Sequence, residues 1–126
     1  VVETPPRLSD GEPFPTFYYA TCPRLTAAIS TLESTGLMAE MNERLAVDAE
    51  LAGAYAAAHD DYLAARAALK MDVPEVEGIS AGGMPNRVKC LHSLVAHSLS
   101  AGPGVNPLGD EALAKLPEWW KNEPCE

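Results

Sequence analysis

Apolar residues recur at helical spacing in three stretches of the first half of the chain. These stretches are Leu25, Ala28, Ile29 and Leu32; Leu37, Met38, Met41 and Leu45; and Leu51, Tyr55, Ala58, Tyr62 and Leu69. Spacings of three and four residues place such side chains on one face of a helix. Pro23 suits the first position of the first helix, Gly36 ends that helix, and Asp48 can cap the third. The pattern therefore predicts three successive helices, the last of them reaching about Lys70.

The second half of the chain predicts a loop and two further helices. Proline and glycine residues between Asp72 and Gly83 predict a long loop. A helix is expected from about Asn86 to Ser100, and its apolar residues cover more than one side, so it should be buried and central. Those residues are Val88, Leu91, Leu94, Val95 and Leu99. A last short helix, from Glu111 to Leu116, is expected after a cap at Asp110.

The N-terminal segment predicts extended structure. Residues 1–4 resemble a short strand, and the prolines that follow up to Pro15 disfavour a helix. A chain of 126 residues is long enough for one domain with a core of ordinary size. The sequence thus predicts a mainly α fold, with residues 1–126 forming a single domain of four or five packed helices behind a short extended N-terminal segment.

Charge and cysteine content limit the partners and the location of the protein. Eighteen acidic and nine basic residues give a formal net charge of −9, which repels phosphate backbones and anionic lipid. No apolar run approaches the roughly 20 residues that cross a bilayer. We therefore expect neither nucleic acid nor a membrane as a partner. Three widely separated cysteines do not form a secreted disulfide framework, which favours a cytoplasmic location.

Metal-ligating residues are crowded into one short segment that contains Cys90, His92 and His97. Thiolate and imidazole groups suit zinc, and iron is a second candidate. On a regular helix, however, Cys90 and His92 point about 200° apart, and Cys90 and His97 are separated by about 10 Å of rise. A metal site therefore requires Cys22 or Cys125 from elsewhere in the chain, or a distorted helix start near Cys90. The competing interpretation is that the cysteines are buried and act as small hydrophobic residues.

The same segment raises the possibility of a cysteine nucleophile. Arg87, Lys89, His97 and a nearby helix N-terminus are groups that can lower the pKa of the Cys90 thiol, and Cys22 also lies near a helix start. No acid or amide is spaced so as to mark it as the partner of a histidine. A cysteine-histidine enzyme that uses Cys90 or Cys22 is therefore the alternative function, and catalysis is left open.

Arg87 and Lys89 are candidates for an anion site. They follow Gly82 and Gly83 at the expected helix start, where backbone N–H groups and two cations can hold a phosphate or carboxylate. Pairing with nearby acidic residues is the competing interpretation. A small anionic ligand is thus one expected partner.

Aromatic residues near both ends of the chain provide anchors for a protein partner. They are Phe14, Phe17, Tyr18, Tyr19, Trp119 and Trp120. Some of these side chains are equally suited to the core, and exposure decides between the two roles.

Four blocks of the chain resemble an actinobacterial family that is catalogued only as a domain of unknown function, number five hundred and one. The blocks are residues 13–19 with 21–25, 32–36, 83–92 and 102–113, and the string Arg87-Val88-Lys89-Cys90-Leu91-His92 is the most specific of them. The resemblance implies no activity or cofactor. It does imply that family members extend further at the N-terminus, so this chain is expected to lack part of the family domain.

Together these features predict a small cytoplasmic domain that binds a protein, a metal or another ligand. The expected metal ligands are drawn from Cys22, Cys90, His92, His97 and Cys125, and the expected anion ligands are Arg87 and Lys89.

Overall fold

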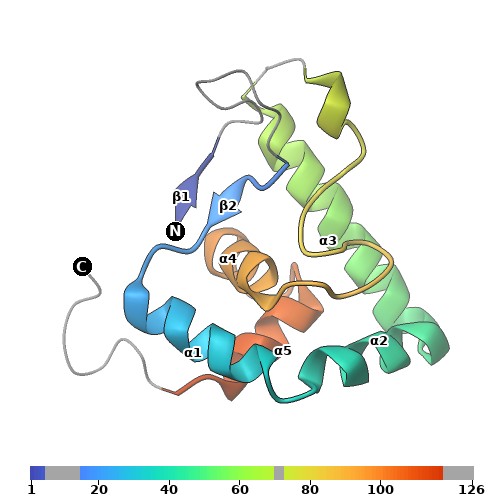
Figure 1. Ribbon diagram of the computed structural model, residues 1–126. Helices are drawn as coiled ribbons and strands as arrows, with labels where there is room; N and C mark the ends of the chain where they lie inside the picture. The colour runs from blue at the N-terminus through green and yellow to red at the C-terminus, as the bar shows by residue number, and fades with distance from the viewer. Residues whose placement is uncertain (5–14, 70–72, 118–126) are drawn as a thin grey trace.

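The computed structural model describes residues 1–4, 15–69 and 73–117 of the chain. Within these ranges the chain is mainly helical, and a short strand pair precedes the helices (Figure 1). The elements are β1 (Val2–Glu3), β2 (Tyr18–Tyr19), α1 (Pro23–Glu33), α2 (Leu37–Val47), α3 (Ala49–Ala67), the 3-10 helix η1 (Pro74–Val76), α4 (Leu91–Ala101) and α5 (Pro107–Lys115). The predicted fold class is therefore confirmed.

The extended N-terminal segment forms one strand of an antiparallel pair. Val2 lies opposite Tyr19, and Glu3 lies opposite Tyr18. The backbone N–H of Thr4 continues the pairing by donating to the carbonyl of Phe17 over 2.6 Å. The strand-like start was predicted, whereas its partner at Tyr18–Tyr19 was not.

Three helix starts follow from their local sequence. Pro23 occupies the first turn of α1, where its missing N–H is not needed. The carboxylate of Asp48 caps α3 by accepting from the N–H of Leu51 over 3.1 Å, as predicted. The last helix begins earlier than predicted, because Asn106 rather than Asp110 caps it by accepting from the N–H of Gly109 over 3.0 Å.

Helix α4 is the central element, as its apolar pattern predicted. Figure 1 shows it among β2, α1 and α5, and it contacts all three. Leu91, Leu94 and Val95 are completely buried. Leu99, which the sequence placed in the core, is instead 40% exposed, because it lies in the last turn of α4 after the buried face has ended.

A glycine allows α5 to pack directly on α4. A Cβ atom at Gly109 would lie 2.3 Å from the carbonyl oxygen of Leu94 and 2.3 Å from Oγ of Ser98. Any larger residue at this position would therefore have to push the two helices apart.

Helix α4 begins at Leu91, and the prediction that it begins near Asn86 is wrong. Residues 82–86 form a turn, and residues 87–90 are not helical. Gly83 in this turn has φ +92°, and a Cβ atom there would lie 2.6 Å from the carbonyl oxygen of Arg87. The turn thus depends on a glycine and places the following residues in an extended path.

Side chains from three helices form hydrogen bonds with the backbone of residues 87–91, which we call segment 87–91. The segment comprises the four residues before α4 and the first residue of α4. Asn42 of α2 donates to the carbonyl of Val88 over 3.1 Å and accepts from its N–H over 2.8 Å. Tyr55 of α3 donates its hydroxyl to the carbonyl of Arg87 over 3.0 Å, and Glu33 of α1 accepts from the N–H of Leu91 over 2.8 Å. These bonds satisfy backbone groups that a helix would otherwise use, so they fix the segment in its extended form.

Candidate metal centre

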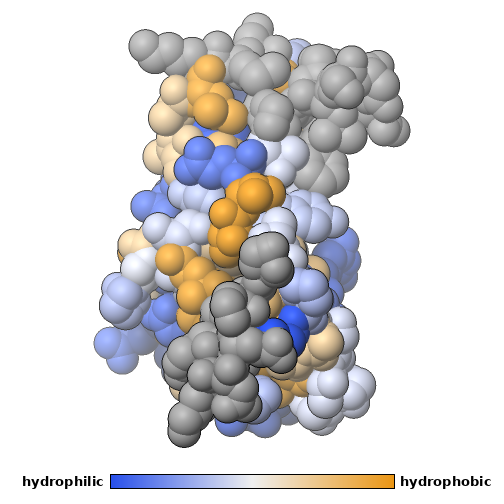
Figure 2. Space-filling model, turned by 90° about the vertical axis from the view of Figure 1, so that its left-hand side faces the viewer, coloured by the Kyte–Doolittle hydropathy of each residue, from blue (hydrophilic) through white to orange (hydrophobic). Residues whose placement is uncertain are grey.

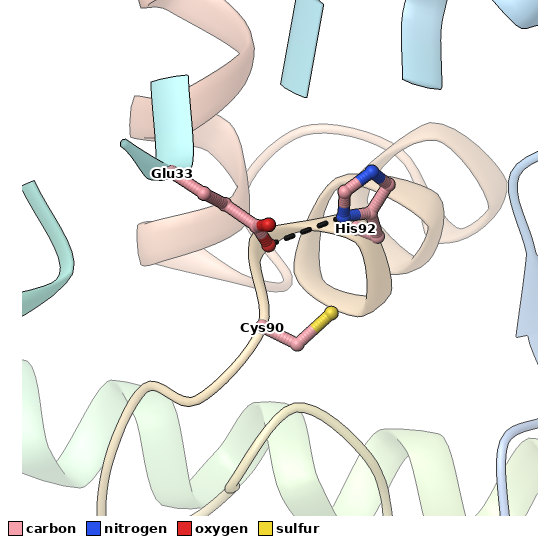
Figure 3. A group of neighbouring side chains, drawn as sticks. All are labelled: Glu33, Cys90 and His92. Atoms are coloured by element: carbon pink, nitrogen blue, oxygen red, sulfur yellow. Dashed lines mark hydrogen bonds and ion pairs between the residues drawn. The ribbon is translucent and has the colours of Figure 1, made fainter. Parts of the chain in front are cut away.

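The residues Glu33, Cys90 and His92 converge where α1 ends and α4 begins (Figure 3). Glu33 is the last residue of α1, Cys90 precedes the first residue of α4, and His92 is the second residue of α4. One ligand atom from each residue lies within 4.8 Å of the other two. All three residues are half-buried.

The carboxylate of Glu33 organises this cluster. Its Oε2 atom accepts from the N–H of Leu91 over 2.8 Å and lies 3.1 Å from Nδ1 of His92. The first contact satisfies an N–H at the start of α4 that has no partner within the helix. The second orients the imidazole ring and places a proton on Nδ1, since an ionised carboxylate can only accept.

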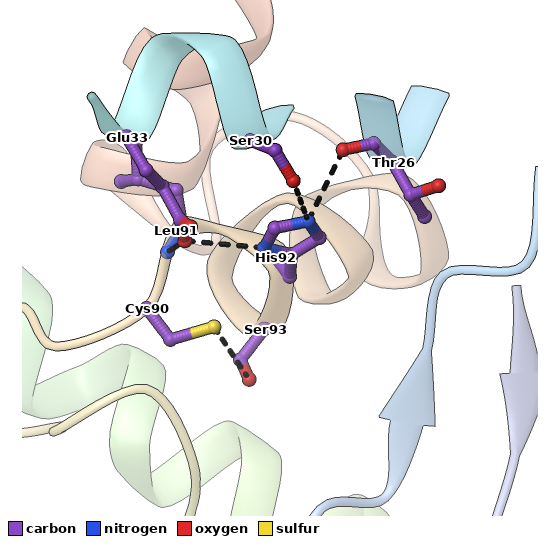
Figure 4. Close-up of polar contacts among 7 residues, drawn as sticks. All are labelled: Thr26, Ser30, Glu33, Cys90, Leu91, His92 and Ser93. Atoms are coloured by element: carbon purple, nitrogen blue, oxygen red, sulfur yellow. Dashed lines mark hydrogen bonds and ion pairs between the residues drawn. The ribbon is translucent and has the colours of Figure 1, made fainter. Parts of the chain in front are cut away.

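The other ring nitrogen of His92 faces α1. Nε2 lies 3.2 Å from the carbonyl oxygen of Thr26 and 3.3 Å from the hydroxyl of Ser30 (Figure 4). Nε2 can accept from the Ser30 hydroxyl when the ring is neutral, or donate to the Thr26 carbonyl when the ring is charged. Either way, both ring nitrogens have partners.

The backbone at Cys90 explains how its side chain reaches the same side as His92. Cys90 has φ −153° and ψ 117°, which is an extended conformation outside the helix. The angular separation expected for a regular helix therefore does not apply. Of the possibilities that the sequence left open, the non-helical start near Cys90 is the one observed.

The donor set of the cluster suits a transition metal. A thiolate, an imidazole and a carboxylate are all ligands of zinc, and three protein ligands leave a fourth position open. Donors around a tetrahedral zinc ion lie about 3.5 Å apart, given bond lengths of roughly 2.0–2.3 Å. To enclose an ion, the ligand atoms, which lie within 4.8 Å of one another, must move closer together. The thiol of Cys90 and the His92 nitrogen that faces Glu33 must also lose their protons, so that metal bonds replace the hydrogen bond between Glu33 and His92.

The geometry favours ligation over a nucleophile relay. In a relay, one ring nitrogen faces the nucleophile and the other faces the carboxylate. Here Nδ1 of His92 faces Glu33, and Nε2 points toward Thr26 and Ser30 rather than toward Cys90 (Figure 4). The Cys90 sulfur instead accepts a weak bond from the Ser93 hydroxyl, with the two atoms 3.9 Å apart.

A cavity of about 510 Å³ adjoins the cluster. Cys90 and His92 form part of its wall. The remainder consists of uncharged side chains from β2, its flanking residues, α1 and α4: Thr16, Tyr18, Tyr19, Ala20, Thr26 and Ser93. This volume is in the range of small-molecule sites.

Other predicted ligands lie outside this cluster. Cys22 is buried at the start of α1 and is disulfide-bonded, so its sulfur is not a free donor. Cys125 lies outside the described residues. Cys90 and His92 are therefore the members of the predicted metal set that the described structure brings together.

His97 is a fully buried core residue with a partner at each ring nitrogen. Nε2 lies 2.8 Å from Oδ2 of Asp61, and Nδ1 lies 3.2 Å from Nδ2 of Asn106. The amide orientation of Asn106 is fixed, because its Oδ1 accepts from the N–H of Gly109. Asn106 thus donates to Nδ1, and Nε2 donates to the carboxylate of Asp61.

Arg87 and Lys89 are exposed residues of segment 87–91, not residues of a helix start. Their backbone N–H groups already donate to Gly83 and Gly82, over 3.1 Å and 2.7 Å. Those two groups are therefore not free to bind an anion. A small anionic ligand held by these two side chains stays a prediction.

Glu33 was missed by the sequence interpretation, because it is 59 residues from His92. A weak signal was nevertheless present. Glu33 lies at the C-terminus of α1, where the helix dipole disfavours a negative charge. An acidic residue in that unfavourable position indicates a partner elsewhere in the fold.

Together, the fold and the cluster define a small helical domain with a candidate metal centre. The chain belongs to the family described as "Protein of unknown function (DUF501)", which it matches over residues 1–114. No curated protein and no solved structure matches the chain. Among the described residues, no helix combines the length and the apolar character needed to cross a membrane.

Proposed function

We propose that this domain binds one divalent transition-metal ion through Glu33, Cys90 and His92, and that zinc is the favoured ion. The observation that supports the proposal is the approach of three different ligand atoms to within 4.8 Å of one another. Thiolate and imidazole ligands favour zinc over hard cations such as magnesium and calcium. Iron is the second candidate.

The competing explanation is structural. Glu33 caps α4 through Leu91 and forms an ion pair with His92 whenever that ring is protonated. Neither role requires a thiol, yet Cys90 is a free, half-buried cysteine beside both groups. The thiol is therefore the group whose participation distinguishes the two explanations.

Cobalt binding provides the test. Cobalt(II) takes similar ligands to zinc and reports a thiolate ligand through a charge-transfer absorption band. The chain, first freed of metal with a chelator, is titrated with cobalt(II), and zinc is then added to displace it. We expect one cobalt ion per chain, a thiolate band, and loss of that band on zinc addition.

Matched variants assign the ligands. Cys90→Ser should abolish the thiolate band, and His92→Gln should weaken cobalt binding by at least about tenfold. His59→Gln is the control, because His59 is also half-buried but bonds to Ser80 through Nδ1 over 2.8 Å, away from the cluster. A thiolate band that survives in Cys90→Ser, or no band in the unaltered chain, would show that the cluster is only structural.

A protein partner stays a second proposal, supported by exposed apolar residues on the strand pair. Val1, Val2 and Tyr19 are 47%, 50% and 51% exposed. Figure 2 shows the face on the β1 and α1 side, where apolar side chains alternate with hydrophilic ones. Phe17 and Tyr18 are core residues, and Phe14, Trp119 and Trp120 lie outside the described residues.

The cytoplasmic location also stays a prediction. The disulfide at Cys22 weighs against it, because reducing compartments keep most thiols free. The metal proposal holds in either environment, since Cys90 is not part of a disulfide.

A further inference from the structure

The cavity beside the cluster has a wall that the proposed metal ligands themselves form. Cys90 and His92 line it, whereas Glu33 does not. An ion held among the three residues would therefore have Glu33 on one side and the cavity on the other. The fourth coordination position, which the protein leaves open, would face the cavity.

Charge restricts what can occupy that position. The Cys90 thiolate and the Glu33 carboxylate together neutralise a divalent ion. The six other lining residues are uncharged, and the chain as a whole carries a formal charge of −9. An anionic ligand would thus bring a negative charge to a neutral site in an acidic protein, which is unfavourable. A neutral donor avoids this cost.

The walls also restrict the shape of the ligand. Two of the lining residues, Tyr18 and Tyr19, are aromatic, and a planar ring packs well against aromatic side chains. Thr16, Thr26 and Ser93 provide hydroxyl oxygens that can accept from an N–H group at the edge of a ring. The hydroxyl protons of Thr26 and Ser93 are already donated, to the carbonyl of Pro23 and to the Cys90 sulfur. Soft and borderline metal ions accept aromatic nitrogen donors readily.

We infer that the cavity binds a small, uncharged nitrogen heterocycle of the imidazole or pyridine class, whose ring nitrogen completes the coordination of the metal ion. This inference rests on the proposed metal site. It goes further by assigning the open position, the neighbouring cavity and the chemical class of the ligand.

The cobalt-loaded protein reports binding at the open position directly. Imidazole and pyridine are added at a pH where both are uncharged, and acetate and azide serve as anionic probes of comparable size. We expect the heterocycles to shift the visible cobalt bands while the thiolate band persists, which shows that the ion stays in the protein. The anions should require at least about tenfold higher concentration for the same shift.

A cavity-filling variant locates the ligand. Thr26→Leu adds bulk to the cavity wall but keeps the backbone carbonyl that contacts Nε2 of His92. It should therefore weaken imidazole binding by about tenfold or more without weakening cobalt binding. Thr31→Leu is the matched control, because Thr31 is an exposed residue of the same helix. Each of the two threonines donates its hydroxyl to a carbonyl of the preceding turn, Thr26 to Pro23 and Thr31 to Ala27. Thr16→Leu replaces Thr26→Leu if circular dichroism shows that the latter does not fold.

The outcomes separate the two proposals. If cobalt does not bind with a thiolate band, both the metal site and this inference fail. If cobalt binds but imidazole leaves its bands unchanged, only the inference fails. Equal binding of acetate, or unchanged imidazole binding in Thr26→Leu, would also overturn it.

Discussion

Asn42 forms two hydrogen bonds with the backbone of Val88, accepting from its N–H over 2.8 Å and donating to its carbonyl over 3.1 Å. The side-chain amide thus takes the place of a neighbouring strand for one residue. Together with Tyr55 and Glu33, it fixes the path of segment 87–91 into α4. This rigid path places Cys90 beside His92, so the candidate metal centre depends on a residue of α2 that does not belong to it.

Asn42→Ala should lower the free energy of unfolding by about 2 to 4 kcal/mol, because it leaves both polar groups of Val88 without these partners. Denaturant unfolding measures this loss. Asn86→Ala is the control, since Asn86 is an exposed residue of the same connection, and it should change stability by less than about 0.5 kcal/mol. Equal effects of the two substitutions would mean that the Asn42 bonds do not stabilise the segment.

Two substitutions at Glu33 separate its structural role from its proposed ligand role. Glu33→Gln keeps an oxygen that can accept from the N–H of Leu91 but removes the charge. We expect it to preserve most of the metal-free stability while weakening cobalt binding by at least about tenfold. Glu33→Ala should weaken binding as well, and should also cost about 0.5 to 2 kcal/mol by removing the cap of α4.

The control for Glu33→Gln is Glu43→Gln, which removes one negative charge from an exposed position of α2. It should leave cobalt binding within about twofold of the unaltered chain, because distant exposed charges are screened by salt. Unchanged cobalt binding in Glu33→Gln would exclude the carboxylate from the ligand set.

Gly109→Ala and Gly53→Ala form a pair with opposite expected signs. At Gly109 the new methyl group would meet the α4 backbone at 2.3 Å, and overpacking of this kind costs about 1 to 3 kcal/mol. At Gly53, inside α3, the added Cβ atom would meet nothing within 4 Å beyond the adjacent residues and backbone of its own helix. Alanine should therefore stabilise the helix by about 0.5 to 1 kcal/mol. Thermal unfolding of both variants tests the close packing of α4 on α5, and a stabilising Gly109→Ala would contradict it.

The sequence predicted features that depend on neighbouring residues. The start of α1 at Pro23, the cap of α3 at Asp48 and the buried face of α4 all follow from local spacing and side-chain chemistry. Cys90 and His92 were also recognised as candidate ligands from their proximity in the chain. Their geometry was not predictable, because it depends on where α4 begins.

That helix start is determined by contacts distant in sequence. The partners of residues 87, 88 and 91 are separated from them by 32, 46 and 58 positions. The local pattern around Val88 is compatible with a helix, but the turn at residues 82–86 and the tertiary hydrogen bonds override it. For the same reason, no local pattern could reveal Glu33 as the third member of the cluster.

Buried tyrosines should make the protein sensitive to alkaline pH. Burial raises the pKa of Tyr55 far above its ordinary value of 10.0. Burial also raises the pKa of Tyr62. The backbone N–H groups of Phe17 and Tyr18 donate to the Tyr62 oxygen and partly oppose that second shift. The folded state therefore holds these phenol protons more tightly than the unfolded state does. Full stability is present below about pH 10, and stability falls as the pH rises further, by up to about 1.4 kcal/mol per pH unit for each tyrosine.

Denaturant unfolding at a series of alkaline pH values measures how steeply the free energy of unfolding falls with pH. Tyrosinate absorbance, recorded together with circular dichroism, shows whether the buried phenols ionise only as the fold is lost. Tyr55→Phe removes one such group and should make the slope shallower. It should also cost about 1 kcal/mol near neutral pH, because the carbonyl of Arg87 loses its hydroxyl partner. Met41→Leu, a change at a buried core residue that carries no titratable group, is the control and should leave the slope unchanged. If Tyr55→Phe and the unaltered chain lose stability at the same rate above pH 10, ionisation of Tyr55 is not coupled to unfolding, and its hydroxyl is not held in the core beneath segment 87–91.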